Sequence, residues 1–243
     1  MTRRRWIADE VHADRALLLG QNAQHLERVL RAQVGQEFDV AADGQVRVGK
    51  IVSISDDRVE FELREAVAAG PTLDLTLLTS VFKFDRMEWA IEKATELGVA
   101  AIVPVIARRT DKHLAHAAMR RAERWRRIAH EASQQSRRSD VPAIEDPTRL
   151  AERVKAASSV QRVVLAEQER GMTLRGVLEE AIAKAGAEMP ELEIAIGPEG
   201  GWAPEEAALF DANGWRAASL GPRILRAETA AIAALAVIGS MME

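Results

Sequence analysis

Two glycine-rich loops, each directly after a short apolar run, are the segments of this sequence best suited to bind a ligand. The first runs from Ile196 to Gly201 and reads IGPEGG, and the second runs from Leu220 to Ala230 and reads LGPRILRAETA. Glycine has no Cβ, so the backbone can approach a ligand closely, and free N–H groups there can bind a carboxylate or a phosphate. A plain tight turn is the alternative interpretation of either loop.

The charged and polar residues of these loops add chemical possibilities. Arg226 can pair with an acidic group, and Thr229 can cap the last helix. Neither GxGxxG nor GxxxxGK[ST] occurs, so the sequence supports neither a Rossmann dinucleotide fingerprint nor a P-loop.

The elements that must position these loops follow from Thr72 onward. There, apolar runs alternate with helical patterns, which is typical of a parallel sheet covered by helices. Strands are predicted at 73–82, 101–107, 160–166, 192–197 and 217–221, and helices at 85–97, 114–136, 174–185, after Pro204 and at 229–241. Asp85 with Glu88 resembles a capping box. Both glycine loops would then leave the carboxyl ends of strands, where open α/β folds bind their ligands.

The N-terminal part of the chain predicts a different, β-rich module. Alternating apolar residues surround a turn at Asp43-Gly44, and Gly49 interrupts the pattern like a bulge in a curled sheet or small barrel. A short helix is predicted at 22–31, a second turn at 56–57, and a linker at 66–71.

Charge is distributed unevenly along the chain. The whole sequence has 33 basic and 37 acidic residues, a net charge of −4, yet residues 108–138 hold ten basic and three acidic side chains, a net charge of +7. Because acids scarcely interleave, this stretch predicts a phosphate-binding surface, which the arginines at 3–5 can extend. The solvated face of a helix is the alternative.

Composition narrows the class of protein. With 243 residues, 47% hydrophobic and 29% charged, the chain predicts a globular protein of one or two domains. The absence of cysteine excludes disulfides, thiolate metal sites and cysteine nucleophiles, and the five histidines form no HExxH motif, so no metal is predicted. The N-terminus lacks the pattern of a signal peptide and no long apolar window occurs, which predicts a cytoplasmic protein with no membrane segment.

Further motifs accompany the glycine loops in order along nearly the whole chain. They are His25-Leu26, Val29-Leu30-Arg31, Gly35, Lys83, Arg86, Glu88, Lys93, Glu96-Leu97-Gly98, Pro104, Glu131-Ala132, Gln135-Ser136, Arg138 and Pro142. Together these residues resemble the ribosomal RNA small subunit methyltransferase E family, the bacterial 16S rRNA uridine N3-methyltransferases of the SPOUT superfamily. Ala203 departs from the family pattern, which usually has a serine or threonine there; this weakens a helix cap by about 1 kcal/mol.

This resemblance implies an α/β protein with two domains. Residues 1–70 would form a PUA-like β-barrel that binds RNA, and residues 71–243 a SPOUT methyltransferase domain whose C-terminal chain forms a trefoil knot. It also implies a homodimer through the knotted domain, S-adenosyl-L-methionine as cofactor, and N3-methylation of one uridine of 16S rRNA on the small ribosomal subunit, position 1498 in the usual rRNA numbering.

The resemblance also implies roles for particular residues. The cofactor-binding candidates are Ile196, Gly197, Pro198, Glu199, Gly200, Gly201, Leu220, Gly221, Ile224, Leu225, Arg226, Thr229 and Ala230. Methylation of uracil N3 requires loss of an imide proton, so Arg226 is the candidate to stabilise the uracil anion or, alternatively, to bind RNA phosphate. Glu199 and Glu228 are candidate proton acceptors, with the fixing of loop amides as the alternative role of each. The RNA-binding candidates are Arg3, Arg4, Arg5, Arg31, Lys83, Arg86, Arg109, Arg120, Arg124 and Arg138.

Two other classes of protein stay open at this point. A non-catalytic ribosome-assembly factor would keep the basic stretch and the β module, and would bind RNA without a cofactor. A nucleotide- or phosphate-binding enzyme would use the same glycine loops, although the missing phosphate fingerprints count against it.

Overall fold

The computed structural model describes residues 5–55, 57–68, 73–186 and 190–241. The chain forms two compact units: residues 1–71 with 131–141, and residues 72–130 with 142–243. The long helix α3 (Lys112–Gln135) belongs to both, because its last residues pack with the first unit. Each unit has its own sheet.

The first unit is built on a curled sheet in the order β1-β4-β5-β6-β3-β2. Its strands are β1 (Arg5–Ile7), β2 (Glu10–His12), β3 (Arg15–Leu19), β4 (Glu37–Ala42), β5 (Gln45–Ser55) and β6 (Arg58–Val67). Neighbouring strands pair antiparallel, except that β1 lies parallel to β4. Their inward side chains, among them Leu18, Ile51 and Phe61, form a buried core.

A predicted turn and a predicted bulge of this sheet are both present. The hairpin turn at Asp43-Gly44 is confirmed: both residues have positive φ, 49° and 73°, as a two-residue type I′ turn requires. The bulge at Gly49 is also confirmed, because the register of β5 against β6 shifts between Arg47 and Gly49. A Cβ on Gly49 would lie 2.4 Å from Cγ2 of Val40. Only glycine allows the strands to approach this closely.

Other boundaries in the first unit differ from the prediction. In place of one helix at 22–31, α1 (Gly20–Gln24) continues into a π-helical turn, η1 (His25–Val29). The strand β6 runs into the predicted linker at 66–71, because Val67 pairs with Val46. The rest of that linker, and Asp56 of the predicted turn at 56–57, lie largely outside the described residues.

The second unit contains a parallel sheet in the order β10-β8-β7-β12-β11-β13, with β9 also paired to β8. Its strands are β7 (Leu75–Ser80), β8 (Ala101–Ile106), β9 (Ala143–Ile144), β10 (Thr148–Arg149), β11 (Gln161–Leu165), β12 (Leu192–Ile196) and β13 (Arg216–Ala218). The pairings between these strands are parallel, as the near-continuous apolar runs predict.

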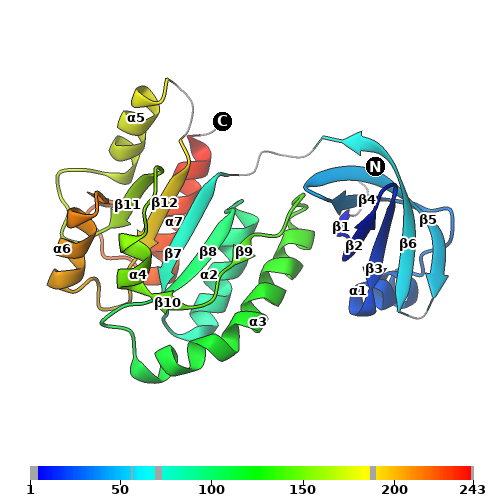
Figure 1. Ribbon diagram of the computed structural model, residues 1–243, viewed down its shortest axis with the longest axis horizontal. Helices are drawn as coiled ribbons and strands as arrows, with labels where there is room; N and C mark the ends of the chain where they lie inside the picture. The colour runs from blue at the N-terminus through cyan, green and yellow to red at the C-terminus, as the bar shows by residue number, and fades with distance from the viewer. Residues whose placement is uncertain (1–4, 56, 69–72, 187–189, 242–243) are drawn as a thin grey trace. The chain divides into compact units, whose positions relative to one another are not determined.

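Helices cover this sheet (Figure 1). Besides α3, they are α2 (Phe84–Glu96), α4 (Leu150–Lys155), α5 (Leu174–Lys184), α6 (Pro204–Ala212) and α7 (Ala227–Ser240). Helix α7 packs against α2 and α5, and α4 packs against α6. Leu150 and Val154 of α4, with Phe210 of α6, join Leu78 and Val103 of the sheet in one core cluster. No helix of the described residues combines the length and apolarity needed to cross a membrane.

The ends of two helices correct the predicted caps. Helix α2 starts at Phe84 with Lys83 at its N-cap, so Asp85 lies inside the first turn and forms no capping box. Helix α7 starts at Ala227 with Arg226 at its N-cap, so Thr229 does not cap it. The sequence prediction missed the strands β1, β2, β3, β9 and β10 and the helix α4, whose few residues show no clear apolar period.

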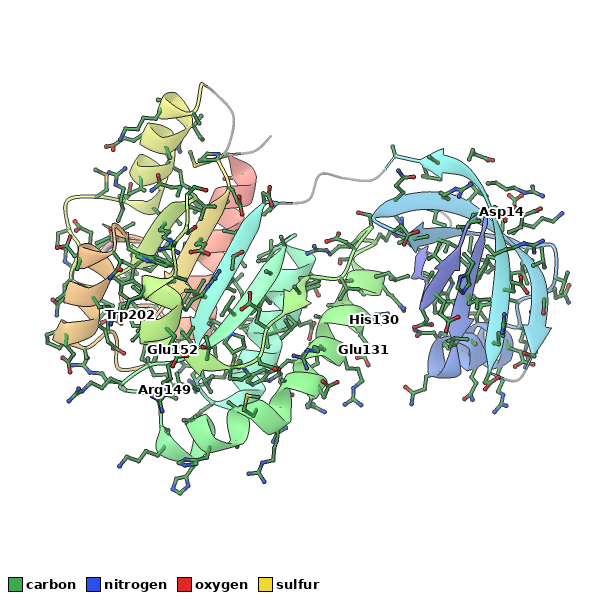
Figure 2. All side chains as sticks on the ribbon, in the orientation of Figure 1. Asp14, His130, Glu131, Arg149, Glu152 and Trp202 are labelled. Atoms are coloured by element: carbon green, nitrogen blue, oxygen red, sulfur yellow. The ribbon has the colours of Figure 1, made fainter. Side chains whose placement is uncertain are left out.

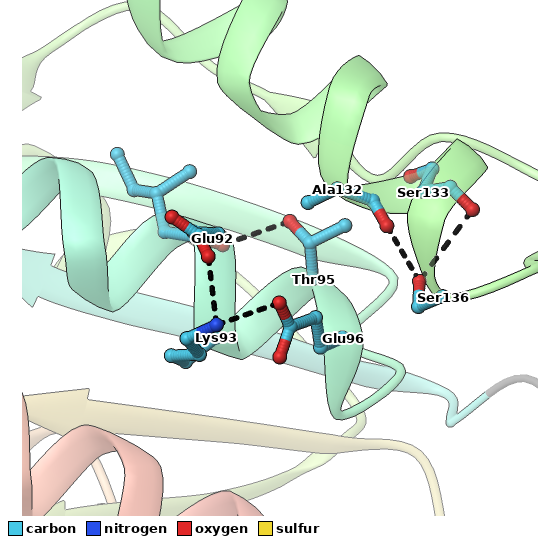
Figure 3. A network of polar contacts seen from close by, with 8 residues as sticks. Glu92, Lys93, Thr95, Glu96, Ala132, Ser133 and Ser136 are labelled. Carbon is cyan, nitrogen blue, oxygen red and sulfur yellow. Dashed lines mark hydrogen bonds and ion pairs between the residues drawn. The ribbon is translucent and has the colours of Figure 1, made fainter.

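The C-terminal half of α2 carries its own polar network (Figure 3). Lys93 Nζ lies 2.7 Å from a carboxylate oxygen of Glu92 and 2.7 Å from one of Glu96. The hydrogen bond to Glu92, followed by that to Glu96, raises the pKa of Lys93 above 10.5. The buried Thr95 hydroxyl donates to the carbonyl of Ile91 at 2.8 Å. These contacts stabilise the helix before it ends near Gly98, whose φ is 93°.

Candidate active site

A pocket of about 240 Å³ lies at the carboxyl edge of the parallel sheet. Its wall comes mainly from three loops, which follow β11, β12 and β13. The strands β12 and β13 both pair with β11, in parallel, so all three loops leave the sheet at the same edge. The register of the sheet therefore brings together segments that are far apart in the sequence.

Most of the predicted cofactor-binding residues line this pocket. Those on the wall are Ile196, Gly197, Pro198, Gly200, Gly201, Leu220, Gly221, Ile224, Leu225 and Ala230. Glu199, Arg226 and Thr229 do not border it, although each is flanked closely by residues that do. The two glycine loops thus form parts of the wall of one cavity.

The sequence prediction missed the third loop of the pocket. Leu165, Ala166, Glu167, Gln168 and Arg170 line the wall after β11. No glycine draws attention to this segment before Gly171. The signal was nevertheless available, because a strand at 160–166 was predicted in the same parallel sheet, and its carboxyl end had to reach the same edge.

Trp202 holds the first glycine loop against the third loop. Trp202 is labelled among the side chains of the second unit in Figure 2. Its indole Nε1 donates to the carbonyl oxygen of Leu165 at 2.9 Å, and its ring meets Phe210 edge-on at 4.8 Å between centroids. A Cβ on Gly197 would lie 3.3 Å from Cε2 of Trp202. A side chain at position 197 would therefore force the indole to shift by a few tenths of an ångström.

Two further glycines of the pocket have backbone conformations that disfavour other residues. Gly201 has a φ of 68°, and its N–H donates to the carbonyl of Pro198 at 2.8 Å, which closes the turn. Gly221 has a φ of 111°, and a Cβ there would meet no protein atom within 4 Å. The backbone at Gly221 thus faces open space in the pocket wall.

The loop after β8 closes another side of the pocket. The guanidinium of Arg109, an RNA-binding candidate of the basic stretch, lies in the pocket wall and donates to the carbonyl of Gly200. Glu206 accepts the N–H of Arg108 at 2.7 Å and that of Ala203 at 2.8 Å. The carboxylate of Glu206 therefore satisfies the N–H of the N-cap residue, whereas Ala203 has no side-chain oxygen to accept an N–H of the first turn.

The candidate catalytic residues lie near the start of α7. Arg226 is exposed at the N-cap of the helix. Glu228 is buried, and it shares Arg86 with Glu199: Arg86 lies 2.7 Å from Glu199 Oε1 and 3.8 Å from Glu228 Oε1. The two candidate proton acceptors thus belong to one ion-pair cluster.

One carboxylate next to the pocket has a shifted pKa. Glu169 accepts hydrogen bonds from the backbone N–H of Gly171 at 2.6 Å and of Met172 at 3.0 Å. These bonds, led by that from Gly171, lower the pKa of Glu169 below its ordinary 4.5. By accepting these two hydrogen bonds, the charged carboxylate of Glu169 fixes the backbone at the end of the loop after β11.

The predicted RNA-binding residues have varied surroundings. Arg31, Lys83, Arg109, Arg120 and Arg124 are exposed, and Arg86 is half-buried. Arg124 also pairs with Glu88 at 2.7 Å. The described residues contain no group of three His, Cys, Asp or Glu that could hold a metal ion.

The side chains of Arg5 and Arg138 are instead largely buried in the first unit. Arg5 pairs with Asp39 at 3.8 Å, and Arg138 pairs with Asp140 at 2.7 Å. Both guanidiniums are therefore paired with a carboxylate and largely shielded from solvent. Arg3 and Arg4 lie outside the described residues.

Comparison with known proteins decides the family. The RNA methyltransferase domain family matches residues 69–239. A ribosomal RNA small subunit methyltransferase E of Synechocystis sp. is 34% identical and covers 90% of this chain and 71% of its own length. That of Bacillus subtilis is 30% identical over 93% of this chain and 90% of its own length. The chain belongs to the ribosomal RNA small subunit methyltransferase E family.

A solved structure agrees with this family membership. The ribosomal RNA small subunit methyltransferase E of Neisseria gonorrhoeae, bound to S-adenosyl methionine, is 27% identical, covers 99% of this chain and 98% of its own, and superposes with a TM-score of 0.82. The likeness extends over both units, so the curled sheet and the parallel sheet together are features of the family.

Proposed function

We propose that this chain transfers a methyl group from S-adenosyl-L-methionine to N3 of one uridine of 16S rRNA in the small ribosomal subunit, the uridine at position 1498 that the resemblance implies. The observation that carries the proposal is the pocket between the glycine loops, in a chain of the ribosomal RNA small subunit methyltransferase E family. A binding-only assembly factor would need no such pocket, so family and pocket both favour the enzyme.

The pocket suits the cofactor in shape and in chemistry. At Gly221 the backbone is open to the cavity, and Gly197, Gly200 and Gly201 contribute backbone to the wall beside the side chains of Trp202 and Arg109. Bare peptide N–H and C=O groups can bind the adenine and the methionine end, while Ile224 and Leu225 supply apolar surface. When bound, the cofactor supplies a methyl group on a cationic sulfur.

The protein must align the uracil and remove a weakly acidic imide proton. Holding two reactants in line supplies several kcal/mol without any nucleophilic side chain. Arg226, exposed at the start of α7, stabilises the negative charge that develops on the uracil oxygens. The N3 proton passes to a carboxylate, for which Glu199 and Glu228 are the candidates.

We assign RNA recognition to the first unit and to the basic residues of α3. The curled sheet of residues 5–67 has the strand content of a PUA-like barrel, and the exposed Arg31 lies beside its π-helical turn. The N3 edge is occupied in a Watson–Crick pair, so the target uridine must be unpaired or turned out, at a cost of a few kcal/mol. In the second unit, Arg120 is the candidate phosphate contact, because it is exposed, whereas Arg124 pairs with Glu88.

We further propose that the C-terminal chain forms the trefoil knot of the SPOUT fold and that the enzyme is a homodimer through this domain. The segment after β13 supports this, since it contributes the wall from Leu220 to Leu225 before α7 packs back against α2 and α5. The exposed Ala236 and Ser240 leave a face of small side chains on α7 for a subunit contact.

Two measurements test the proposed function. Calorimetry of the purified chain with S-adenosyl-L-methionine should show saturable binding. Mass spectrometry of ribosomal RNA from cells with and without the gene should show the loss of one 3-methyluridine of 16S rRNA. RNA binding without cofactor heat, together with unchanged ribosomal RNA, would support the assembly factor instead.

A further inference from the structure

Arg86 connects the two glycine loops from outside the pocket. It lies in the first turn of α2, and its Nη1 is 2.7 Å from Oε1 of Glu199, in the loop after β12. Its Nε is 3.8 Å from Oε1 of Glu228, in the first turn of α7. One guanidinium thus reaches both segments that build the cavity.

The partners of Arg86 are direct neighbours of the pocket wall. Glu199 lies between Pro198 and Gly200, and Glu228 follows Ala227; all three of these neighbours line the pocket. Arg86, Glu199 and Glu228 themselves are not part of the wall. Movement of either carboxylate would therefore displace the wall residues beside it.

The burial of Glu228 makes its charge dependent on the contact with Arg86. The side chain of Glu228 is only 6% exposed, and within the described part of the chain its Oε2 is buried without a hydrogen-bond partner. A buried carboxylate is costly unless a cation compensates its charge. Arg86 is that cation, so its removal would leave the buried carboxylate of Glu228 uncompensated and make the first turn of α7 rearrange.

The position of Arg86 within α2 points to the same role. A positive charge in the first turn of a helix is unfavourable, because the amino end of the helix dipole is itself positive. Arg86 therefore gains nothing from its own helix. Its favourable contacts are the two carboxylates, and the planar guanidinium can face both at once, which an ammonium group does less well.

We propose that Arg86 is a positioning residue of the cofactor pocket, which fixes the two glycine loops relative to each other through Glu199 and Glu228. This inference rests on the proposed function, and it replaces the RNA contact that the family resemblance implies for Arg86. It predicts that Arg86 determines cofactor affinity and leaves RNA affinity unchanged.

The test compares variants of the full chain by calorimetry with S-adenosyl-L-methionine, and by filter binding with 16S rRNA. Arg86→Ala should weaken cofactor binding by roughly tenfold or more, Arg86→Lys should lie between this variant and the native chain, and RNA affinity should stay the same in both. Arg126→Ala is the control, because Arg126 also pairs with two carboxylates, Glu123 and Asp146, and does not adjoin the pocket.

A milder pair of variants keeps the proposal testable if Arg86→Ala does not fold. Glu199→Gln removes the charge of a half-exposed pair, and Glu180→Gln does the same to the Arg216–Glu180 pair, which has nearly the same length of 2.8 Å. Only Glu199→Gln should weaken cofactor binding, and in the Arg86→Lys background its further effect should be smaller than in the native chain.

The outcomes separate the inference from the proposed function. Native cofactor affinity in Arg86→Ala and Glu199→Gln, or weaker RNA binding alone in Arg86→Ala, would overturn the role of Arg86. Lower melting temperatures with unchanged cofactor affinity would also overturn it, since they indicate general stabilisation. Absence of cofactor binding by the native chain would contradict the proposed function itself.

Discussion

At the scale of single residues, two glycines of the second unit have similar backbone strain in different surroundings. Gly214, in the turn before β13, has a φ of 76°, and Gly221, in the pocket wall, has a φ of 111°. Neither would place a new Cβ within 4 Å of another atom. They therefore separate the cost of backbone strain from the effect of a side chain in the pocket.

We expect Gly214→Ala and Gly221→Ala to lower the free energy of unfolding by comparable amounts, about 1–3 kcal/mol each. Only Gly221→Ala should weaken the binding of S-adenosyl-L-methionine, by at least about tenfold, because its Cβ enters the space that the backbone leaves open. Calorimetry for binding and urea denaturation for stability measure the two effects. Equal cofactor affinity in both variants would show that the second loop is not part of the binding site.

Glu169 gives a prediction about pH. Hydrogen bonds from Gly171 and Met172 lower its pKa in the folded chain, so the folded state binds fewer protons at this group than the unfolded state does near pH 4.5. The stabilisation is therefore fully present above about pH 4.5 and is lost as the pH falls through the lower, folded value.

An NMR titration should give Glu169 a pKa below 4.5, and the amide resonances of Gly171 and Met172 should shift over the same pH range. In Glu169→Gln these two amides should no longer titrate. A pKa for Glu169 at or above its ordinary value would show that the carboxylate does not hold the end of the third loop.

At the scale of elements, a buried ion-pair cluster joins β11, β12 and the end of α4. Glu193 is 6% exposed and Arg162 is 7% exposed. Oε2 of Glu193 accepts from Arg162 Nε at 2.9 Å, and Oε1 accepts from Arg153. Arg162 also donates to the carbonyl of Ala156 at 2.7 Å. The cluster lies near the amino ends of these strands, opposite the edge that carries the pocket.

Glu193→Gln should lower the free energy of unfolding by about 3–5 kcal/mol, because two arginines would keep their charge beside a neutral amide in a buried position. The control is Glu179→Gln, which removes the exposed pair with Arg175 and should cost less than about 1 kcal/mol. Urea denaturation of both variants measures the difference. If Glu193→Gln costs less than about 1 kcal/mol, water reaches the cluster and compensates the charges.

The pocket also depends on the order of elements. The strands before its three loops are adjacent, with β11 between β12 and β13, whereas along the chain β11 comes first and the helix α5 separates it from β12. Because the three strands pair in parallel, their carboxyl ends and the loops that follow them lie at one edge of the sheet. Trp202 and Arg86 then join loops that only the sheet has brought into reach.

At the scale of the whole molecule, charge separates the basic stretch from the rest of the chain. The net charge is −4 overall and +7 over residues 108–138. Not all of these cations are available to RNA: Arg124 and Arg121 pair with Glu88, and Arg126 pairs with Asp146. Arg120 and Arg127 are exposed on α3, so they are the residues on which to test RNA binding.

The double variant Arg120→Glu and Arg127→Glu should weaken 16S rRNA binding and reduce the slope of log K against log salt by about 0.7–0.9 for each phosphate that the protein no longer neutralises. Lys155→Glu with Lys184→Glu makes the same change in net charge at exposed positions of α4 and α5, and should have a smaller effect. Filter binding over a range of salt concentrations measures both. Equal slopes in the two double variants would identify the basic face of α3 as a solvated surface.

The sequence by itself determined the type of each sheet, most of the strands, and the two glycine loops. These depend on local signals: the period of apolar residues, the Asp43-Gly44 dipeptide of a hairpin turn, and the glycines at the bulge and in the two loops. It did not reveal the third pocket loop, because the residues around Glu167 show no pattern until β11 is known to lie between β12 and β13.

Tertiary structure alone decided which charges are paired. Arg86, Arg109 and Arg138 look alike in the sequence, yet one ties two loops, one lines the pocket and one is buried against Asp140. Ion pairs and burial depend on contacts between residues far apart in the chain, such as the 113 positions between Arg86 and Glu199. Local residue patterns cannot encode such contacts, which exist only after the sheet has folded.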